Sequence, residues 1–155
     1  MIENLPATAT IRDVAAMRLL DEVEKRILDR LGGERIDRAG DTSKDAPVFH
    51  HFTPGLYARE LHMPKGMVIT SQIHKTRHPF VVSKGSSFVY MGGSRWEKIE
   101  APHFGITEPG TRRLLIIMED TIWTTFHVTD KTDVYEIADD ILIPYENPLL
   151  AEGRE

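Results

Sequence analysis

The sequence predicts a single domain with an all-β core, a sandwich or barrel, preceded by an amphipathic helix and followed by a short helix. Three observations predict this class. A chain of 155 residues is long enough to bury a core as one domain. Residues 48–129 break into nine short runs of strand type separated by turn signals. Residues 10–31 instead carry apolar side chains at helical spacing.

The first predicted helix spans residues 10–31, with Thr10 as its N-cap and Gly32-Gly33 as its stop. Two interpretations of this helix stay open: it packs on its own domain, or it is an arm that docks on a neighbouring subunit. The predicted organisation is therefore a helical arm at 1–33, a polar linker at 34–47, a barrel at 48–130, and a C-terminal helix and tail at 131–155.

The predicted strands share β-type composition and are bounded by glycine, proline or acidic turns. They lie at Val48–Phe52, Leu56–Met63, Met67–His74, Phe80–Ser83, Ser86–Met91, Trp96–Ala101, His103–Thr107, Leu114–Met118 and Thr121–Val128. A short capped helix is expected to begin near Asp133 and to end before Pro144. Residues from Asn147 onward are expected to form an exposed end.

Composition excludes several classes of protein. The net charge is −5, which argues against a nucleic-acid-binding surface. The absence of cysteine excludes disulfides, thiolate zinc sites and thiol nucleophiles. No apolar run approaches membrane-spanning length, and the N-terminus lacks a signal-peptide core. We therefore expect a protein that is not secreted by a signal peptide and does not act on a membrane.

Three polar side chains recur at even offsets in the segment that begins at Gly66. Gln72, His74 and His78 follow a strand-like run, and residues two apart in a strand share a face. His127 ends another predicted strand. The pattern predicts a metal site inside a small β-barrel.

This segment resembles the first motif of the cupin superfamily, in which a glycine, five residues, His-x-His, a glutamate and a later glycine follow one another. Here Gly66 and Gly85 hold the glycine positions, Gln72 replaces the first histidine, and His78 replaces the glutamate. The second motif is weaker: Pro109-Gly110 supplies its turn, but its histidine is missing. The resemblance covers roughly half of the chain and implies a cupin-type jelly-roll barrel.

His127 is a geometric replacement for the missing histidine. If residues 119–120 close a tight hairpin, then Met118 faces Thr121, and His127 lies opposite Arg112. In that register both faces of these strands are apolar, with Leu114 and Ile116 on the face of His127 and Leu115 and Ile117 on the other. A barrel wall that faces water should alternate, so something must cover the outer face. We therefore expect a homo-oligomer, most simply a two-fold dimer, with docking to other subunits through the N-terminal helix.

The predicted metal ligands are His74, His78 and His127, with Gln72 as a weaker ligand or a residue that orients them. Neutral imidazoles suit a divalent transition metal such as Zn, Fe, Mn or Ni. Alternatively, the histidines fill a polar lumen and bond to one another, to backbone or to water. Tyr57 and Arg59 share a strand face and could line the lumen as substrate-binding residues. Arg112 either binds a substrate carboxylate or is a charge at the rim.

A narrower resemblance concerns the runs 50–60, 73–76 and 123–127, which are similar to small cupin-like proteins carried by phages and prophages. It implies a cytoplasmic protein or a component of a phage particle. The first hypothesis is therefore a binding or assembly module, structural or accessory to a virion. The second is a metal-dependent enzyme, dioxygenase-like or isomerase-like, that acts on a small polar molecule. A third is a ligand sensor without metal. The pattern favours the first and leaves enzymatic activity open.

Overall fold

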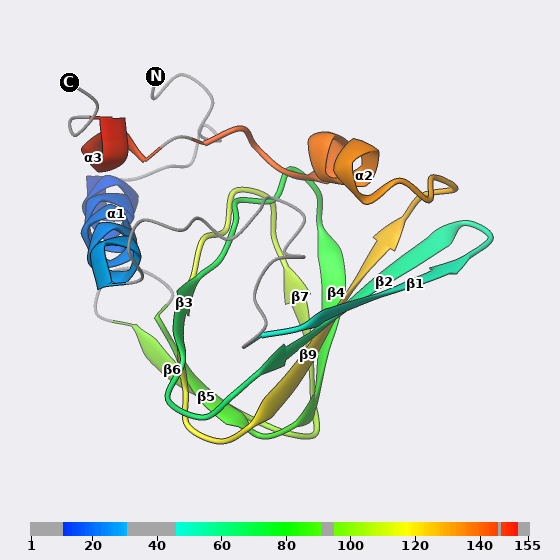
Figure 1. Ribbon diagram of the computed structural model, residues 1–155, viewed down its shortest axis with the longest axis horizontal. Coiled ribbons are helices and arrows are strands. Elements are labelled where there is room, and N and C mark those ends of the chain that lie inside the picture. The colour runs from blue at the N-terminus through cyan, green and yellow to red at the C-terminus, as the bar shows by residue number, and fades with distance from the viewer. Residues whose placement is uncertain (1–10, 31–45, 91–94, 146, 152–155) are drawn as a thin grey trace.

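The computed structural model describes residues 11–30, 46–90, 95–145 and 147–151, with nine strands and three helices in that part of the chain (Figure 1). The elements are α1 (Ile11–Arg30), β1 (Val48–Thr53), β2 (Leu56–Met63), β3 (Val68–Thr70), β4 (His78–Lys84), β5 (Ser86–Tyr90), β6 (Trp96–Glu100), β7 (His103–Thr107), β8 (Leu114–Ile117), β9 (Thr121–Val128), α2 (Val134–Ile141) and α3 (Pro148–Ala151). All nine predicted strands are confirmed, although β3 ends four residues before His74, the predicted end of that strand.

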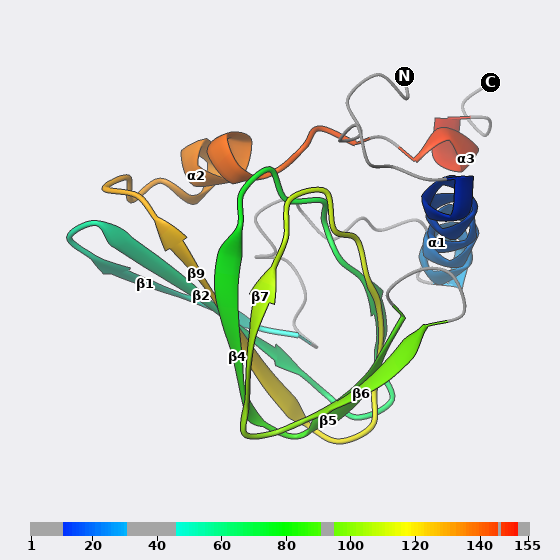
Figure 2. The same cartoon turned by 180° about the vertical axis from the view of Figure 1, so that it is seen from behind.

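The strands form two antiparallel sheets that face each other as the two walls of a barrel (Figures 1 and 2). The five-stranded sheet has the order β1-β2-β9-β4-β7, and the four-stranded sheet has the order β3-β8-β5-β6. The predicted jelly-roll barrel is therefore confirmed. Its core lies between the two sheets, where Phe80 stacks on Trp123 with ring centroids 4.5 Å apart.

The predicted hairpin between Leu114–Met118 and Thr121–Val128 is wrong. Strand β8 pairs with β3 and β5, whereas β9 pairs with β2 and β4. The turn at residues 119–120 therefore carries the chain from one sheet to the other instead of joining two neighbours. As a consequence, Leu115 and Ile117 pack in the barrel core, and Leu114 lies on the outer face of its sheet. The apolar residues of β8 thus pack on both sides of the sheet, against the barrel core on one side and against α1 on the other.

Helix α1 covers the outer face of the four-stranded sheet. Its Ala16 and Leu20 pack with Tyr90 of β5 and Leu114 of β8 in a small apolar cluster. Figures 1 and 2 show the helix lying outside this wall of the barrel. The helix therefore packs on its own domain, which was one of the two interpretations left open. The expected cap Thr10, the stop Gly32-Gly33 and the linker up to residue 45 lie outside the described residues.

The C-terminal segment returns to the barrel. Asp133 caps α2 as expected, accepting hydrogen bonds from the backbone N–H groups of Tyr135 and Glu136. The residues after α2 then bond to the backbone of residues 73–75. The expectation of an exposed end is wrong for Asn147, which is only 2% exposed and donates to the backbone oxygen of Asp21 in α1, and residues 152–155 lie outside the described residues. None of the described helices is both long and apolar enough to cross a membrane.

Candidate metal site

Three histidines from distant parts of the chain converge in the barrel. His78 opens β4, His127 lies near the end of β9, and His74 stands in the segment between β3 and β4. One nitrogen from each ring can be chosen so that the three atoms lie within 4.8 Å of one another. The ring centroids of His74 and His127 each lie close to that of His78, at 4.4 and 4.5 Å.

Strand register explains why two of these rings meet. Strand β4 pairs with β9 in antiparallel fashion, with Phe80 opposite Thr125. Continued by two residues, the same register places His78 opposite His127. Tyr57 of β2 is the register partner of His127 on its other side. The expected convergence of the three histidines is thus present, although it arises from the β4–β9 pairing and not from the hairpin used to predict it.

His74 reaches the cluster from irregular backbone. Its segment forms an isolated bridge to Leu142, and the neighbouring N–H groups of Lys75 and Ile143 donate to Ile141 and Ile73. The C-terminal segment therefore holds the His74 loop in place. The sequence pattern did not predict this contact. It predicted one extended strand through His74 and gave no sign that residues 141–143 would pair with it.

Burial keeps the three imidazoles neutral near pH 7. The pKa of His74 and of His127 is lowered to about 3, mainly by burial and to a lesser extent by neighbouring charged groups. Burial also lowers the pKa of His78, partly opposed by its hydrogen bond to backbone. Neutral imidazole is the form that binds a metal ion, so the cluster needs no deprotonation to act as a ligand set.

Hydrogen bonds orient two of the rings. His78 Nδ1 donates to the backbone oxygen of Thr76 at 3.0 Å, which leaves Nε2 unprotonated because a carbonyl can only accept. His127 Nε2 lies 3.0 Å from the Thr125 hydroxyl, whereas its buried Nδ1 has no hydrogen-bond partner in the described part of the chain. An orphaned buried nitrogen is costly, and a metal ion would satisfy it. The donor set therefore fits a divalent transition metal.

The predicted ligand Gln72 is placed differently. It is exposed and lies beyond the end of β3. The expectation relied on strand alternation from residue 66 to residue 74, but β3 ends at Thr70, so that alternation stops before Gln72. Because residues 71–77 are not in a strand, the two-residue spacing of Gln72 and His74 does not put their side chains on the same face.

The predicted substrate-binding residues divide into two groups. Tyr57 stacks on His127 with centroids 5.9 Å apart, so it lies at the histidine cluster, and Arg59, two residues along the same strand, is the register partner of Thr125. Arg112 lies elsewhere. Its guanidinium is buried against α1, where it donates to Asp21 at 2.6 Å and to Glu24 at 2.8 Å. Neither a rim charge nor a carboxylate-binding role agrees with those contacts.

The neighbouring Arg113 is a site residue that sequence reasoning missed. It is 8% exposed, donates to the Thr107 hydroxyl at 3.0 Å and lies over the ring of Phe80. Thr107 is the register partner of His78, so Arg113 extends from the four-stranded sheet to the wall that carries the histidines. The sequence held a signal for this residue. Arg113 is two and four residues before Leu115 and Ile117, which face the core, so strand alternation predicts that its side chain points the same way.

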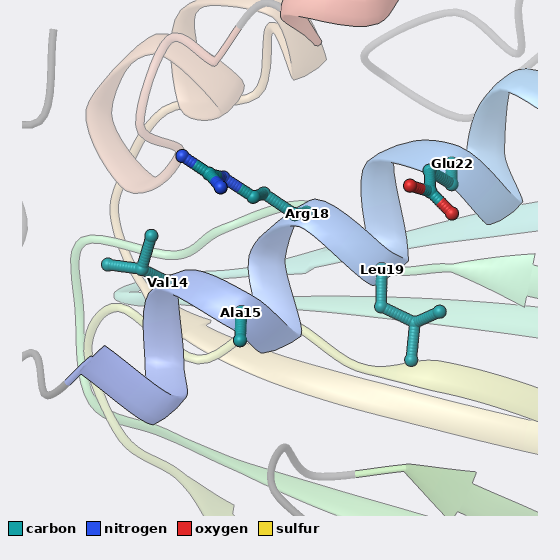
Figure 3. A pocket seen from close by; sticks show the side chains of 5 residues that line it. All are labelled: Val14, Ala15, Arg18, Leu19 and Glu22. Atoms are coloured by element: carbon teal, nitrogen blue, oxygen red, sulfur yellow. The ribbon is translucent and has the colours of Figure 1, made fainter.

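A shallow depression on α1 offers no comparable chemistry. It is lined by Val14, Ala15, Arg18, Leu19 and Glu22, all from the same helix (Figure 3). Because one helix supplies every lining residue, it is a surface feature of that helix. Among the described residues, the histidine group is the one cluster of three or more side chains suited to hold a metal.

No protein-family model matches the sequence, and no curated protein matches it either. Solved structures do resemble it in fold. Salicylate 1,2-dioxygenase from Pseudaminobacter salicylatoxidans aligns over 79% of this chain with 13% identity and a TM-score of 0.52. A second structure of that enzyme, an adduct with gentisate, aligns over 78% with 12% identity and a TM-score of 0.51. KdgF from Halomonas sp. aligns over 56% of this chain and 82% of its own, with 17% identity and a TM-score of 0.46.

These likenesses are of fold. The chain spans 36% and 33% of the two dioxygenase chains, so it corresponds to about a third of that enzyme. Identities this low establish a shared fold and no shared activity. The neighbours are proteins of the cupin fold, and the two-sheet barrel described above has that fold.

Proposed function

We propose that this protein is a cupin-fold barrel whose lumen holds a catalytic-type metal centre, and that it acts on a small polar molecule. The observation that carries the proposal is the neutral, largely buried group of His74, His78 and His127. Three protein ligands leave positions free for exchange, whereas closed structural sites use four. Both dioxygenase and isomerase chemistry agree with such a centre.

The protein's own residues prepare this site. Thr76 fixes the tautomer of His78, and Thr125 holds one nitrogen of His127, so two ligands are oriented in advance. Tyr57 stacks against His127 and covers one side of its ring. The Phe80–Trp123 stack belongs to the buried apolar core of the same barrel. When bound, the divalent metal would supply a Lewis acid or an oxygen-binding centre.

Metal content tests the proposal. Full-length protein without a histidine tag is purified, incubated with Fe(II), Mn(II), Ni(II) or Zn(II), desalted and measured by mass spectrometry. We expect near-stoichiometric metal, falling at least tenfold in a His74→Ala/His78→Ala variant. A His51→Ala/His62→Ala variant is the matched control, because it removes two histidines that bond to Glu60 outside the cluster. Retention of metal by the first variant, or none in the wild type, would refute the site.

Cobalt distinguishes a catalytic centre from a closed one. Co(II) bound in place of the native metal absorbs in the visible range according to its coordination. We expect azide to change this spectrum, because an exchangeable position should remain beside three histidines. An unchanged spectrum at saturating azide would leave a structural metal site and would contradict the enzymatic proposal.

A second candidate function is assembly, and one observation favours it. The outer face of the five-stranded sheet exposes apolar side chains of β7, with Phe104 66% exposed and Ile106 38% exposed. We propose that this face associates with a second copy of the chain. Its register neighbours Val81 and Pro79 extend the apolar surface onto β4. Virion association and docking through α1 stay predictions from the sequence, without a comparable observation.

A further inference from the structure

Arg113 is a buried cation without a carboxylate partner among the described residues. Its Nη1 donates to the Thr107 hydroxyl, and its guanidinium carbon lies 5.4 Å from the centroid of the Phe80 ring. Its Nε is buried and has no hydrogen-bond partner in the same part of the chain. Glu97 acts on it only as a more distant charge. The Nε side of the guanidinium is therefore left without a hydrogen-bond partner or a counter-charge among the described residues.

The contrast with Arg112 is informative. Arg112 is equally buried, at 8% exposure, but it pairs with both Asp21 and Glu24. A buried charge costs several kcal/mol unless it is paired and hydrogen-bonded, and arginine does not escape this cost by losing its proton. Arg112 meets that requirement within the protein, whereas Arg113 meets only part of it. An anionic ligand would complete the environment of Arg113.

The unpaired cation lies beside the histidine cluster. Thr107, which accepts its hydrogen bond, is the register partner of His78. The Arg113 charge acts on His74 and His78, and the Arg59 charge acts on His74 and His127. The described metal-ligand group contains three neutral rings and no acid. Arg113 therefore places a positive charge beside the histidine rings even before a metal is added.

We propose that the lumen binds a small organic carboxylate, with the carboxylate held by the guanidinium of Arg113. A carboxylate matches the planar N–H pairs of arginine in a bidentate manner, and its negative charge offsets the buried cation. Phe80 beneath the guanidinium fixes the plane of the fork. The inference names the substrate class for the proposed function and rests on it for the chemistry, although the carboxylate contact itself does not require the metal.

The test uses full-length, ¹⁵N-labelled protein and two probes of the same shape, acetate and neutral acetamide. A buried arginine Nε–H gives an observable NMR signal, and the Arg113 signal is assigned by its loss in Arg113→Met. We expect acetate to shift this signal saturably and acetamide to leave it unchanged. The titration is run with metal-free protein and with metal-loaded protein, and metal content is measured in each sample.

Two substitutions separate charge from packing. Arg113→Met keeps most of the side-chain volume, and Arg113→Lys keeps the charge but loses the fork. We expect Arg113→Met to weaken acetate binding at least tenfold, measured through the ring signals of the three histidines, with metal content unchanged. Arg113→Lys should restore part of the affinity. Arg95→Met is the control, since Arg95 is exposed and lies outside the cluster.

The outcomes separate this inference from the proposed function. Acetate binding that depends on Arg113 supports the inference even in a protein that takes up no metal, a result that would refute only the metal centre. Metal bound without any acetate-dependent shift at Arg113, or acetate binding equal in wild type and Arg113→Met, would overturn the inference. If Arg113→Met does not fold, the loss of the signal in Arg113→Lys assigns it, and the comparison of acetate with acetamide on the wild type then supports or overturns the inference.

Discussion

Individual buried polar residues determine what this barrel can bind. Two adjacent arginines take opposite roles because strand alternation sends their side chains to opposite faces of the four-stranded sheet. Arg113 turns toward the lumen and reaches Thr107, whereas Arg112 turns outward to Asp21 of α1. The sequence left Arg112 open between a carboxylate-binding residue and a charge at the rim, whereas its contacts place it against α1, and the carboxylate-binding role that we propose falls to Arg113 instead.

Tyr145 is a titrating residue outside the barrel lumen, and it supports a pH prediction. Burial, together with its hydrogen bonds to Asp21, raises the pKa of Tyr145 to about 12 from its ordinary value near 10. Between these values the folded protein keeps a proton that the unfolded chain loses. The stabilisation is therefore complete below pH 10 and is lost as the pH rises through 12.

The measurement is urea unfolding at intervals from pH 9 to pH 12. We expect the free energy of unfolding to fall more steeply with pH in the wild type than in Tyr145→Phe, which cannot ionise. Absorbance of tyrosinate in the folded protein should independently show one tyrosine that titrates late. Equal slopes for the two proteins would contradict the buried hydrogen bond to Asp21.

At the scale of elements, the corner between β4 and β5 moves the chain from one sheet to the other. Gly85 forms this corner with φ of +83°, and a Cβ at this position would collide with the backbone oxygen of Asp120. Gly66, the other glycine of the motif, has φ of +89°, but a Cβ there would meet no other atom of the described chain within 4 Å. Both positions therefore require a positive φ, which favours glycine, but only at Gly85 would an added Cβ collide with another part of the chain.

Alanine substitution at these two positions should separate the two effects. We expect Gly66→Ala to lower the free energy of unfolding by roughly 1–2 kcal/mol, the cost of a left-handed conformation for an L-residue. Gly85→Ala should cost about 3 kcal/mol or more, because overpacking against backbone adds to the strain. Urea unfolding of both variants measures the difference. A Gly85→Ala variant as stable as Gly66→Ala would show that the corner can relax.

At the scale of the whole molecule, α1 and the C-terminal segment are parts of the barrel domain. Asp21 of α1 binds Arg112, Tyr145 and Asn147 in one network that joins the helix to the barrel and to the C-terminal segment. Removing residues 1–33 would leave Arg112 buried without its partners and would uncover Tyr90 and Leu114. These contacts hold α1 on its own domain, whereas docking of α1 on a neighbouring subunit stays a prediction.

Association through the outer face of the five-stranded sheet is a prediction at the same scale. We expect the wild type to sediment as a dimer and Phe104→Glu to sediment as a monomer, because a charge in an apolar interface is left unpaired. Phe88→Glu is the matched control, since Phe88 is an exposed phenylalanine on the other sheet, at 39% exposure. A monomeric wild type, or a Phe104→Glu dimer, would exclude this face as the contact.

The sequence by itself determined the strands, the cap of the second helix and the identity of the three histidines. These features depend on local alternation, on turn residues and on spacing within a short segment, all of which are read along the chain. Tertiary structure alone decided that β8 and β9 belong to different sheets, that β3 ends before the exposed Gln72, and that Arg113 and not Arg112 enters the lumen. Each of these depends on which strands pair across the barrel, which cannot be read along the chain. A register shift of one residue is enough to send every side chain of a strand to the opposite face.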